Sequence, residues 1–218
     1  MPFSNATDKA LKLPRQSLSQ EVYEKLIEKF LKSELVPGHI LNRRDIAQQL
    51  GISVAPVLEA LLQLEMEGFV ESIPRKGTFV KPIRQEDIYG QLMLREAVEC
   101  QAARLYHGAP VKSNLENLSL LATELEQTDA DSPEHWKQEI AFHARLVELS
   151  NCPALLREFK RFMRLGVFYS INRILPIAKR LERYSHRSLI DVLAEAEPDA
   201  AEQAVREHLR SGKLQLFS

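Results

Sequence analysis

Hydrophobic residues recur at helical spacing in three segments of the first third of the chain. The first segment is expected to form a helix over about residues 18–34, with apolar positions at i, i+4, i+5, i+8 and i+9 from Val22. A second helix is expected between Asn42 and Gly51, and a third between Ser53 and Gly68. Asn and Ser favour helix N-caps, and Gly favours the residue that ends a helix. The pattern therefore predicts three helices with a tight glycine turn between the second and the third.

The pattern then changes to that of strands. Residues 69–73 and 78–81 are rich in β-formers and flank the turn Pro74-Arg75-Lys76-Gly77. Two helices joined by a tight turn and followed by a hairpin have the layout of a winged helix-turn-helix, which places one helix in the DNA major groove. Residues 17–82 are thus predicted to form a DNA-binding domain.

Beyond Pro82 the strand pattern disappears and helical periodicity continues to the C-terminal end. Helices are expected at about 86–107, 113–128, 133–150, 153–173, 176–196 and 199–212. Residues 1–16 are polar, show no periodicity and are expected to be a flexible tail. The predicted fold class is mainly α, with an N-terminal winged helix-turn-helix (three helices plus a β-hairpin wing) and a C-terminal all-α helical bundle over residues 83–218.

Composition narrows the functional classes. Hydrophobic residues make up 44% of the chain and charged residues 27%, which is ordinary for a soluble globular protein. No apolar run approaches the roughly 18 residues that span a bilayer, and the first residues do not form a secretory signal, so we expect a cytoplasmic protein without a membrane partner. Cys100 and Cys152 lie far apart and in no metal-like spacing, and they are interpreted as buried or unreactive thiols. The net charge of -1 means that any DNA attraction must come from a local patch.

Candidate DNA contacts gather at the predicted helix starts and at the wing. Arg43 and Arg44 begin the second helix, and Ser53 begins the third, where hydroxyl and backbone N–H groups suit a phosphate. Arg75 and Lys76 lie at the wing tip. Taken singly, each is as well explained as an ordinary surface residue. Their order along a helix-turn-helix and wing favours phosphate contacts, which give affinity and register.

The N-terminal part resembles the GntR family of bacterial transcription factors. The resemblance covers almost all of residues 18–81, and its pieces keep their mutual spacing; they include Val36-Pro37-Gly38, Asp45-Ile46-Ala47, Leu50-Gly51-Ile52-Ser53, Pro56-Val57, Glu59-Ala60-Leu61, Glu67-Gly68-Phe69-Val70 and Arg75-Lys76-Gly77-Thr78-Phe79-Val80. The resemblance implies a regulator that binds double-stranded operator DNA, with Arg44 at a DNA-contacting position.

One departure from the family pattern affects the recognition helix. The family usually has Ser-Arg-x-Pro-Val-Arg-Glu-Ala-Leu there, and this chain has Val54 and Leu58 in place of both arginines. An arginine bound to guanine contributes roughly 1–3 kcal/mol of base discrimination. Their replacement is expected to weaken, redirect or abolish DNA binding. Val54 and Ala55 are candidates for contact with thymine methyl groups, with Arg44 and the wing cations carrying most of the remaining contact.

Four residues in the helical part have the chemistry of a metal site. Glu139 and His143 are separated by one helical turn and project from the same face, while His186 and His208 lie on later helices. Three imidazoles and a carboxylate are typical ligands of zinc, nickel or another divalent first-row metal, and helix bundles build such sites from facing helices. The alternative interpretation is that these are unrelated surface or core histidines.

The helical part resembles the FCD ligand-binding domain, the sensor of the FadR branch of GntR regulators. Its signatures cover residues 86–212 and include Leu94-Arg95-Glu96-Ala97-Val98-Glu99, Phe142-His143-Ala144-Arg145-Leu146, Ser150-Asn151 and His186-Arg187-Ser188-Leu189-Ile190. Metal-binding members use one Asp and three His. The resemblance therefore implies a divalent metal, with zinc first, bound by His143, His186, His208 and, in place of the Asp, Glu139.

The same resemblance implies a small carboxylate effector, such as an organic or sugar acid, bound beside the metal. Arg95 matches the family's pocket arginine, and Asn172 and Arg173 are weaker candidates for the same pocket. The alternative for Arg95 is an i,i+4 salt bridge with Glu99 on the helix surface.

The motifs and resemblances are compatible with three functional hypotheses. The leading hypothesis is a homodimeric transcriptional regulator, typically a repressor relieved by its effector. The second is a metal-dependent small-molecule binding protein, derived from a regulator, that no longer reads DNA. The third is a metallohydrolase, which the winged module and the lack of an identifiable extra base or nucleophile make the weakest.

Overall fold

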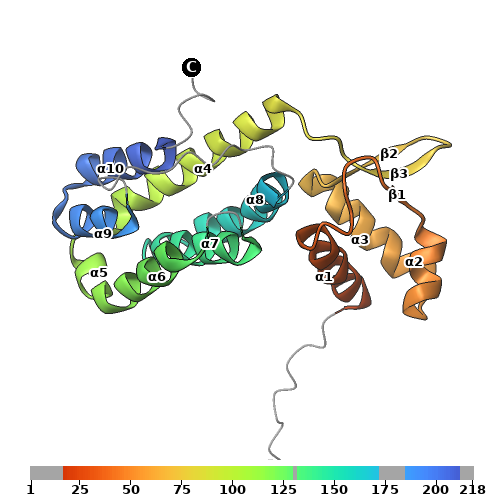
Figure 1. Cartoon of the computed structure of the whole chain (residues 1–218), viewed down its shortest axis with the longest axis horizontal. Coiled ribbons are helices and arrows are strands. Elements are labelled where there is room, and N and C mark those ends of the chain that lie inside the picture. Colours follow the sequence, from red (N-terminus) through yellow and green to blue (C-terminus); the bar gives the residue numbers. More distant parts are fainter. Residues whose placement is uncertain (1–16, 130–131, 172–184, 212–218) are drawn as a thin grey trace, which may run out of the picture.

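The computed structural model describes residues 17–129, 132–171 and 185–211, which form a small N-terminal part and a larger helical part (Figure 1). The expected tail at 1–16 lies outside the described residues. The N-terminal part contains α1 (Leu18–Leu31), α2 (Arg43–Leu50), α3 (Val54–Glu67) and the strands β1 (Ile40–Leu41), β2 (Val70–Ile73) and β3 (Gly77–Val80). This arrangement confirms the predicted winged helix-turn-helix.

Local sequence explains the turns of this part. The Asn42 side chain accepts a hydrogen bond from the Arg44 backbone N–H at 2.9 Å and so caps α2. Gly51 and Gly68 end α2 and α3 in the left-handed region, at φ 66° and 89°. Such a backbone conformation is open to glycine and disfavoured for residues with a Cβ atom.

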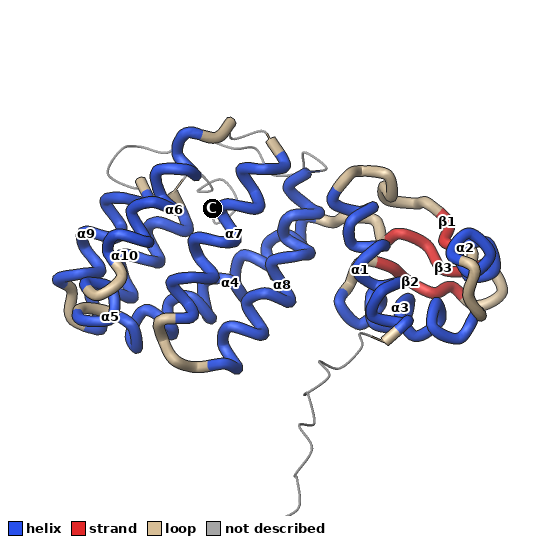
Figure 2. Tube along the Cα trace, turned by 90° about the horizontal axis from the view of Figure 1, so that it is seen from below, coloured by secondary structure: helices blue, strands red, loops and turns tan. Residues whose placement is uncertain are grey.

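The three strands form one antiparallel sheet in the order β1-β3-β2 (Figure 2). Val70 lies opposite Val80 in the hairpin, and Ile40 lies opposite Phe79. The hairpin was predicted, but β1 was not. A two-residue strand has no alternation of its own, and its partner is distant in sequence.

The helical part contains α4 (Gln85–Tyr106), α5 (Ala109–Lys112), α6 (Leu115–Gln127), α7 (Pro133–Glu148), α8 (Pro153–Ile171), α9 (His186–Glu195) and α10 (Pro198–Arg210). The one-turn helix α5 was not predicted. The expected helix at 176–196 was wrong at Ser185, which is extended and whose side chain caps α9 by accepting from the Ser188 N–H. Residues 176–184 of that expected helix lie outside the described ranges. None of the described helices is long and apolar enough to cross a membrane.

Two hydrophobic cores organise the described residues, and α8 belongs to both. Phe159 and Phe162 of α8 lie in the core of the helical part, whereas Leu165 and Phe168 lie in the core of the N-terminal part. The Phe168 ring centroid is 5.1 Å from that of Phe30 in α1, in an edge-on contact. Ile88 and Leu92 of α4 join the same N-terminal core. The N-terminal core therefore includes residues beyond the expected boundary at Pro82.

Candidate functional site

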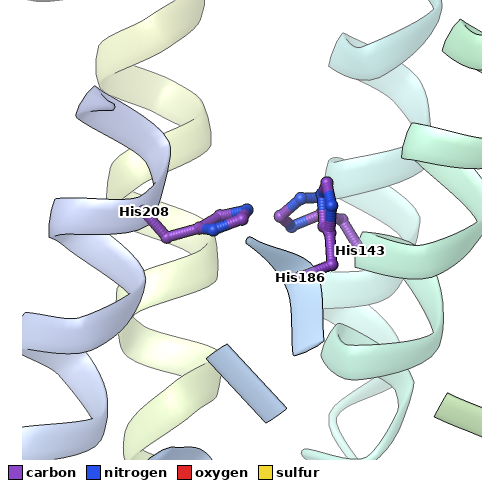
Figure 3. A group of neighbouring side chains, drawn as sticks. All are labelled: His143, His186 and His208. Atoms are coloured by element: carbon purple, nitrogen blue, oxygen red, sulfur yellow. The ribbon is translucent and has the colours of Figure 1, made fainter. Parts of the chain in front are cut away.

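Three histidines from three helices converge inside the helical part. His143 comes from α7, His186 is the first residue of α9, and His208 lies near the end of α10 (Figure 3). They offer nitrogen atoms that all lie within 4.8 Å of one another, and none of the three residues is more than 4% exposed. Nitrogen ligands bind zinc at about 2.0–2.1 Å in a tetrahedral arrangement, so two of them lie about 3.4 Å apart around one ion. An inward shift of less than about 1 Å would suit the ion.

Glu139 lies beside this cluster, one turn before His143 on α7, and is 2% exposed. Its Oε2 is 3.0 Å from His186 Nε2, and its Oε1 is 3.5 Å from His143 Nε2. The structure thus brings together all four residues that the sequence marked as candidate ligands. Three imidazoles and one carboxylate fit a divalent first-row metal.

The two ring nitrogens of His143 have different surroundings. Nδ1 is 2.5 Å from the Glu99 Oε2 atom. Nε2 has no hydrogen-bond partner among the described residues, although it is fully buried. A buried nitrogen without a partner is costly, and a bound metal would satisfy it. This is the observation that best matches the site to a metal ion.

A buried arginine joins the carboxylates around the cluster. Arg95 Nε donates to Glu99 Oε1 at 2.6 Å, and an Nη atom of Arg95 donates to Glu139 Oε1 at 3.1 Å. The i,i+4 pair with Glu99 exists, but placing it on the helix surface was wrong, since Arg95 is 5% and Glu99 2% exposed. The face of α4 that carries them packs inward. Asn172 and Arg173, the other effector candidates, lie outside the described residues.

The electrostatics of this group follow from burial and close pairing. Burial alone would raise the pKa of Glu99, but the Arg95 charge and the contacts with Arg95 and His143 outweigh it and lower the pKa to about 2. Burial lowers the pKa of Arg95, and the two carboxylates more than compensate, so its pKa is raised. Glu99 is therefore an anion and Arg95 a cation at neutral pH. Sequence reasoning missed the contact of Glu99 with His143, because only the i,i+4 spacing to Arg95 is visible along the chain.

The candidate DNA contacts all lie on the N-terminal part and are exposed. Arg43 and Arg44 occupy the first turn of α2, while Arg75 and Lys76 form the turn between β2 and β3. Figure 1 places α2 and the end of the wing on the side of the molecule away from the helical part. Ser53 is the N-cap residue of α3 and its side chain makes no capping hydrogen bond. The three predicted contact regions thus share an accessible end of the molecule, with Val54 and Ala55 opening α3 there.

The outer face of α3 is apolar along its whole length. Side chains at i, i+4, i+8 and i+12 are exposed by 37, 40, 49 and 79%; they are Val54, Leu58, Leu62 and Met66. The two positions at which the family pattern has arginine are therefore exposed, and in this chain they are aliphatic. A helix with this face offers methyl groups and no charged hydrogen-bond donors to its surroundings.

Comparisons with known proteins agree with this architecture. Residues 18–80 match the family described as "Bacterial regulatory proteins, gntR family", and residues 91–211 match the FCD domain. An HTH-type transcriptional regulator in an unstable DNA locus of Streptomyces ambofaciens is 28% identical over 88% of this chain and 82% of that protein. A probable D-xylose utilization operon transcriptional repressor of Paenarthrobacter nicotinovorans is 26% identical over 94% and 90%.

Solved structures share the fold. A putative GntR transcriptional regulator from Rhodococcus sp. RHA1 has a TM-score of 0.72 at 22% identity, covering 93% of this chain and 98% of that one. E. coli McbR/YncC has a TM-score of 0.66 at 21% identity over the same shares. These likenesses extend over both parts of the molecule.

Proposed function

We propose how operator binding is controlled in this chain, which belongs to the gntR family of bacterial regulatory proteins and carries an FCD domain. The chain is a transcriptional regulator. In our proposal a divalent metal, zinc first, is held by Glu139, His143, His186 and His208, and a small carboxylate effector binds beside it. Effector binding then changes the affinity of a homodimer for its operator.

The buried cluster is the observation that carries the metal proposal. His143 Nε2 is buried without a hydrogen-bond partner among the described residues, and it belongs to a cluster with His186 and His208. Glu139 Oε2 lies 3.0 Å from His186 Nε2. When bound, the metal supplies a Lewis-acidic centre that accepts a carboxylate oxygen. Arg95 lies next to Glu139, and its guanidinium is the cation suited to the remaining effector oxygens.

The exposed end of the N-terminal part supports the DNA proposal. Arg43 and Arg44 would contact the phosphate backbone beside the groove, and Arg75 and Lys76 would reach phosphates or the minor groove from the wing. Ser53 and the start of α3 would face the major groove, with Val54 and Ala55 against base edges. A dimer would place two such helices at half-sites about one DNA turn apart.

We infer that α8 couples the two sites, because it packs against α7, which carries two of the proposed metal ligands, and also against α1 and α3 of the winged part. Leu165 and Phe168 of α8 are buried in the core that holds α1 and α3. Farther toward the start of α8, Arg164 donates to the Tyr23 hydroxyl at 2.9 Å, and that hydroxyl donates to Glu67 at the end of α3 at 2.6 Å. A shift of α8 would thus move the recognition helix directly. Coupling further requires that the effector bind two dimer geometries with different affinities.

The sense of regulation proposed here is repression relieved by the effector. One relative is named a transcriptional repressor of a D-xylose utilization operon, and another, from E. coli, is named the transcriptional repressor RspR. The match with this chain covers at least 88% of the length of each relative, at 26 and 22% identity. The names of these relatives support repression as the direction of regulation. The effector of this chain has to be identified by experiment.

Selection of bound sequences from a random double-stranded DNA pool tests the proposal. The purified, zinc-loaded full chain is expected to enrich a palindromic site, and binding to it is expected to fall steeply with salt. Arg44→Ala should bind the same site more weakly, since one phosphate contact is lost. Lys112→Ala is a matched control, because it removes the same positive charge from α5, at the end of the helical part away from the winged part (Figure 1).

No enrichment from folded, zinc-loaded protein would overturn the DNA-reading part of the proposal. It would favour a metal-dependent binding protein that has lost operator recognition. Zinc content is measured on the same samples, so a failure of the metal site is detected separately from a failure to bind DNA.

A further inference from the structure

We propose that Glu99 is a positioning residue of the metal centre, which holds His143 in the tautomer whose Nε2 faces the metal and is itself held by Arg95. This inference rests on the proposed function, since it concerns the same metal site. Glu99 and Arg95 would then surround the four proposed ligands and hold them in place, so Arg95 has a structural role before any effector binds.

The hydrogen-bond pattern fixes the direction of the histidine. The Glu99 carboxylate is paired with the Arg95 guanidinium and can only accept, so the Nδ1 atom 2.5 Å from its Oε2 carries the proton. In a neutral imidazole the other nitrogen, Nε2, then carries the lone pair. That atom is the one 3.5 Å from Glu139 and without a hydrogen-bond partner among the described residues. A histidine ligand usually donates its second N–H to such a carboxylate or carbonyl, which sets its orientation and raises its basicity.

Arg95 makes this orientation rigid. Its Nε donates to the other oxygen of Glu99, so both oxygens of that carboxylate are engaged by different helices. The same guanidinium also donates to Glu139, one of the proposed ligands. The Arg95 guanidinium on α4 therefore contacts two carboxylates, that of Glu99 and that of the proposed ligand Glu139. Glu99 contacts Nδ1 of His143, and Glu139 lies beside Nε2 of the same ring.

This geometry requires a carboxylate at position 99. A glutamine has the same shape but only one acceptor oxygen, and its amide nitrogen is a donor. If the amide oxygen faces His143, the amide nitrogen opposes the Arg95 donor. If the oxygen faces Arg95, the amide nitrogen donates to Nδ1 of His143, and the ring proton moves to Nε2, which a metal must displace. Either arrangement weakens the site.

The test is the zinc affinity of Glu99→Gln, measured on the full chain by competition with a chromogenic chelator. We expect affinity about 10- to 100-fold below that of the unsubstituted chain. Glu99→Asp keeps both acceptor oxygens and should recover part of the loss. Glu96→Gln is the matched control, because Glu96 is also buried on α4 but pairs with Arg206 and Arg210 of α10. It should keep zinc affinity within a few-fold.

A second measurement does not depend on a variant that folds. Long-range nitrogen–proton NMR of the metal-free, unsubstituted chain should show His143 protonated at Nδ1. Protonation at Nε2 instead, or equal zinc affinities for Glu99→Gln and Glu96→Gln, would overturn the proposal. An unsubstituted chain that binds no zinc would refute the metal site itself, which is a different outcome from a site that binds zinc without help from Glu99.

Discussion

The outer face of α3 and the interior of the helical part depart from the usual distribution of residues in opposite ways. Along α3, aliphatic side chains such as Leu58 and Leu62 are 40 and 49% exposed. Inside the helical part, Arg95, Glu99 and Glu139 are at most 5% exposed. Buried charge and contiguous exposed apolar surface are the informative exceptions to hydrophobic burial. These two regions lie at proposed binding sites, one for DNA and one for a metal and an effector.

The two exceptions differ in what they demand of the surrounding structure. An exposed leucine needs no compensation and can be replaced at little cost in stability. A buried charge must be paired and hydrogen-bonded, since its desolvation penalty amounts to several kcal/mol. Substitutions in the buried charged cluster of the helical part should therefore lower the free energy of unfolding strongly. Substitutions on the outer face of α3 should change DNA binding only.

The strongest test of this difference is Arg95→Met in the metal-free chain. Methionine removes the guanidinium that both Glu99 and Glu139 share and leaves two buried carboxylates without it. Breaking a buried pair in this way typically costs about 3–5 kcal/mol, so we expect a decrease of that size in the free energy of unfolding. Chemical denaturation followed by the fluorescence of Trp136, the chain's single tryptophan and a residue of α7, measures it in the helical part.

Lys112→Met is the control for Arg95→Met, because Lys112 pairs with Glu195 at the surface, where both side chains are about half exposed or more. It should leave the denaturation midpoint almost unchanged, as surface ion pairs contribute little. Equal effects of the two substitutions would mean that the Arg95 cluster is not the charged, buried network described above.

The second test addresses the ligands. His186→Ala is expected to reduce zinc affinity by more than about 100-fold, because an outer partner alone accounts for 10–100-fold. A ligand that binds only the folded state raises its melting temperature, so zinc should stabilise the unsubstituted chain and not the variant. His135→Ala on α7 is the control, since His135 lies outside the cluster of three. A variant that kept the full zinc-dependent rise would exclude His186 as a ligand.

Much of the fold was predictable because its signals are local. Asn42, Gly51 and Gly68 delimit the helices of the winged part, and each has the cap conformation that its residue type favours. The i,i+4 spacing of Glu139 and His143 was enough to place both on one face of α7. The elements that were missed carry weak local signals: β1 has two residues, and α5 has a single turn after Gly108.

The site was predictable only in part, for the same reason. Convergence of His186 and His208 on His143 depends on how three helices pack. The residue types alone left a metal site and unrelated histidines as alternatives, and the family resemblance favoured the metal site. The spacing of Arg95 and Glu99 predicted an ion pair, but an ion pair on a surface and one in a core have the same spacing. Burial of that pair and its contact with His143 are tertiary facts, produced by a charged face of α4 that packs against α7 and α10.

The third and smallest effect is expected at the recognition helix, where Leu58→Arg restores an arginine at a family position. The side chain is 40% exposed, so the guanidinium can be accommodated without burying charge. If α3 enters the major groove, the new arginine should add about 1–3 kcal/mol to binding of sites with guanine at the matching position. Sequence selection followed by titration of the enriched site measures both the preference and the affinity.

Met66→Arg is the matched control, since it adds the same charge at the opposite end of α3, where the side chain is 79% exposed. Base contacts come from the N-terminal residues of a recognition helix, so this variant should raise affinity slightly and equally for all sequences. Equal behaviour of the two arginines would show that α3 does not read bases and that Arg44 and the wing account for DNA binding. A new guanine preference in Leu58→Arg alone would show that the apolar face lies in the groove, and that its methyl groups stand where related proteins have charged donors.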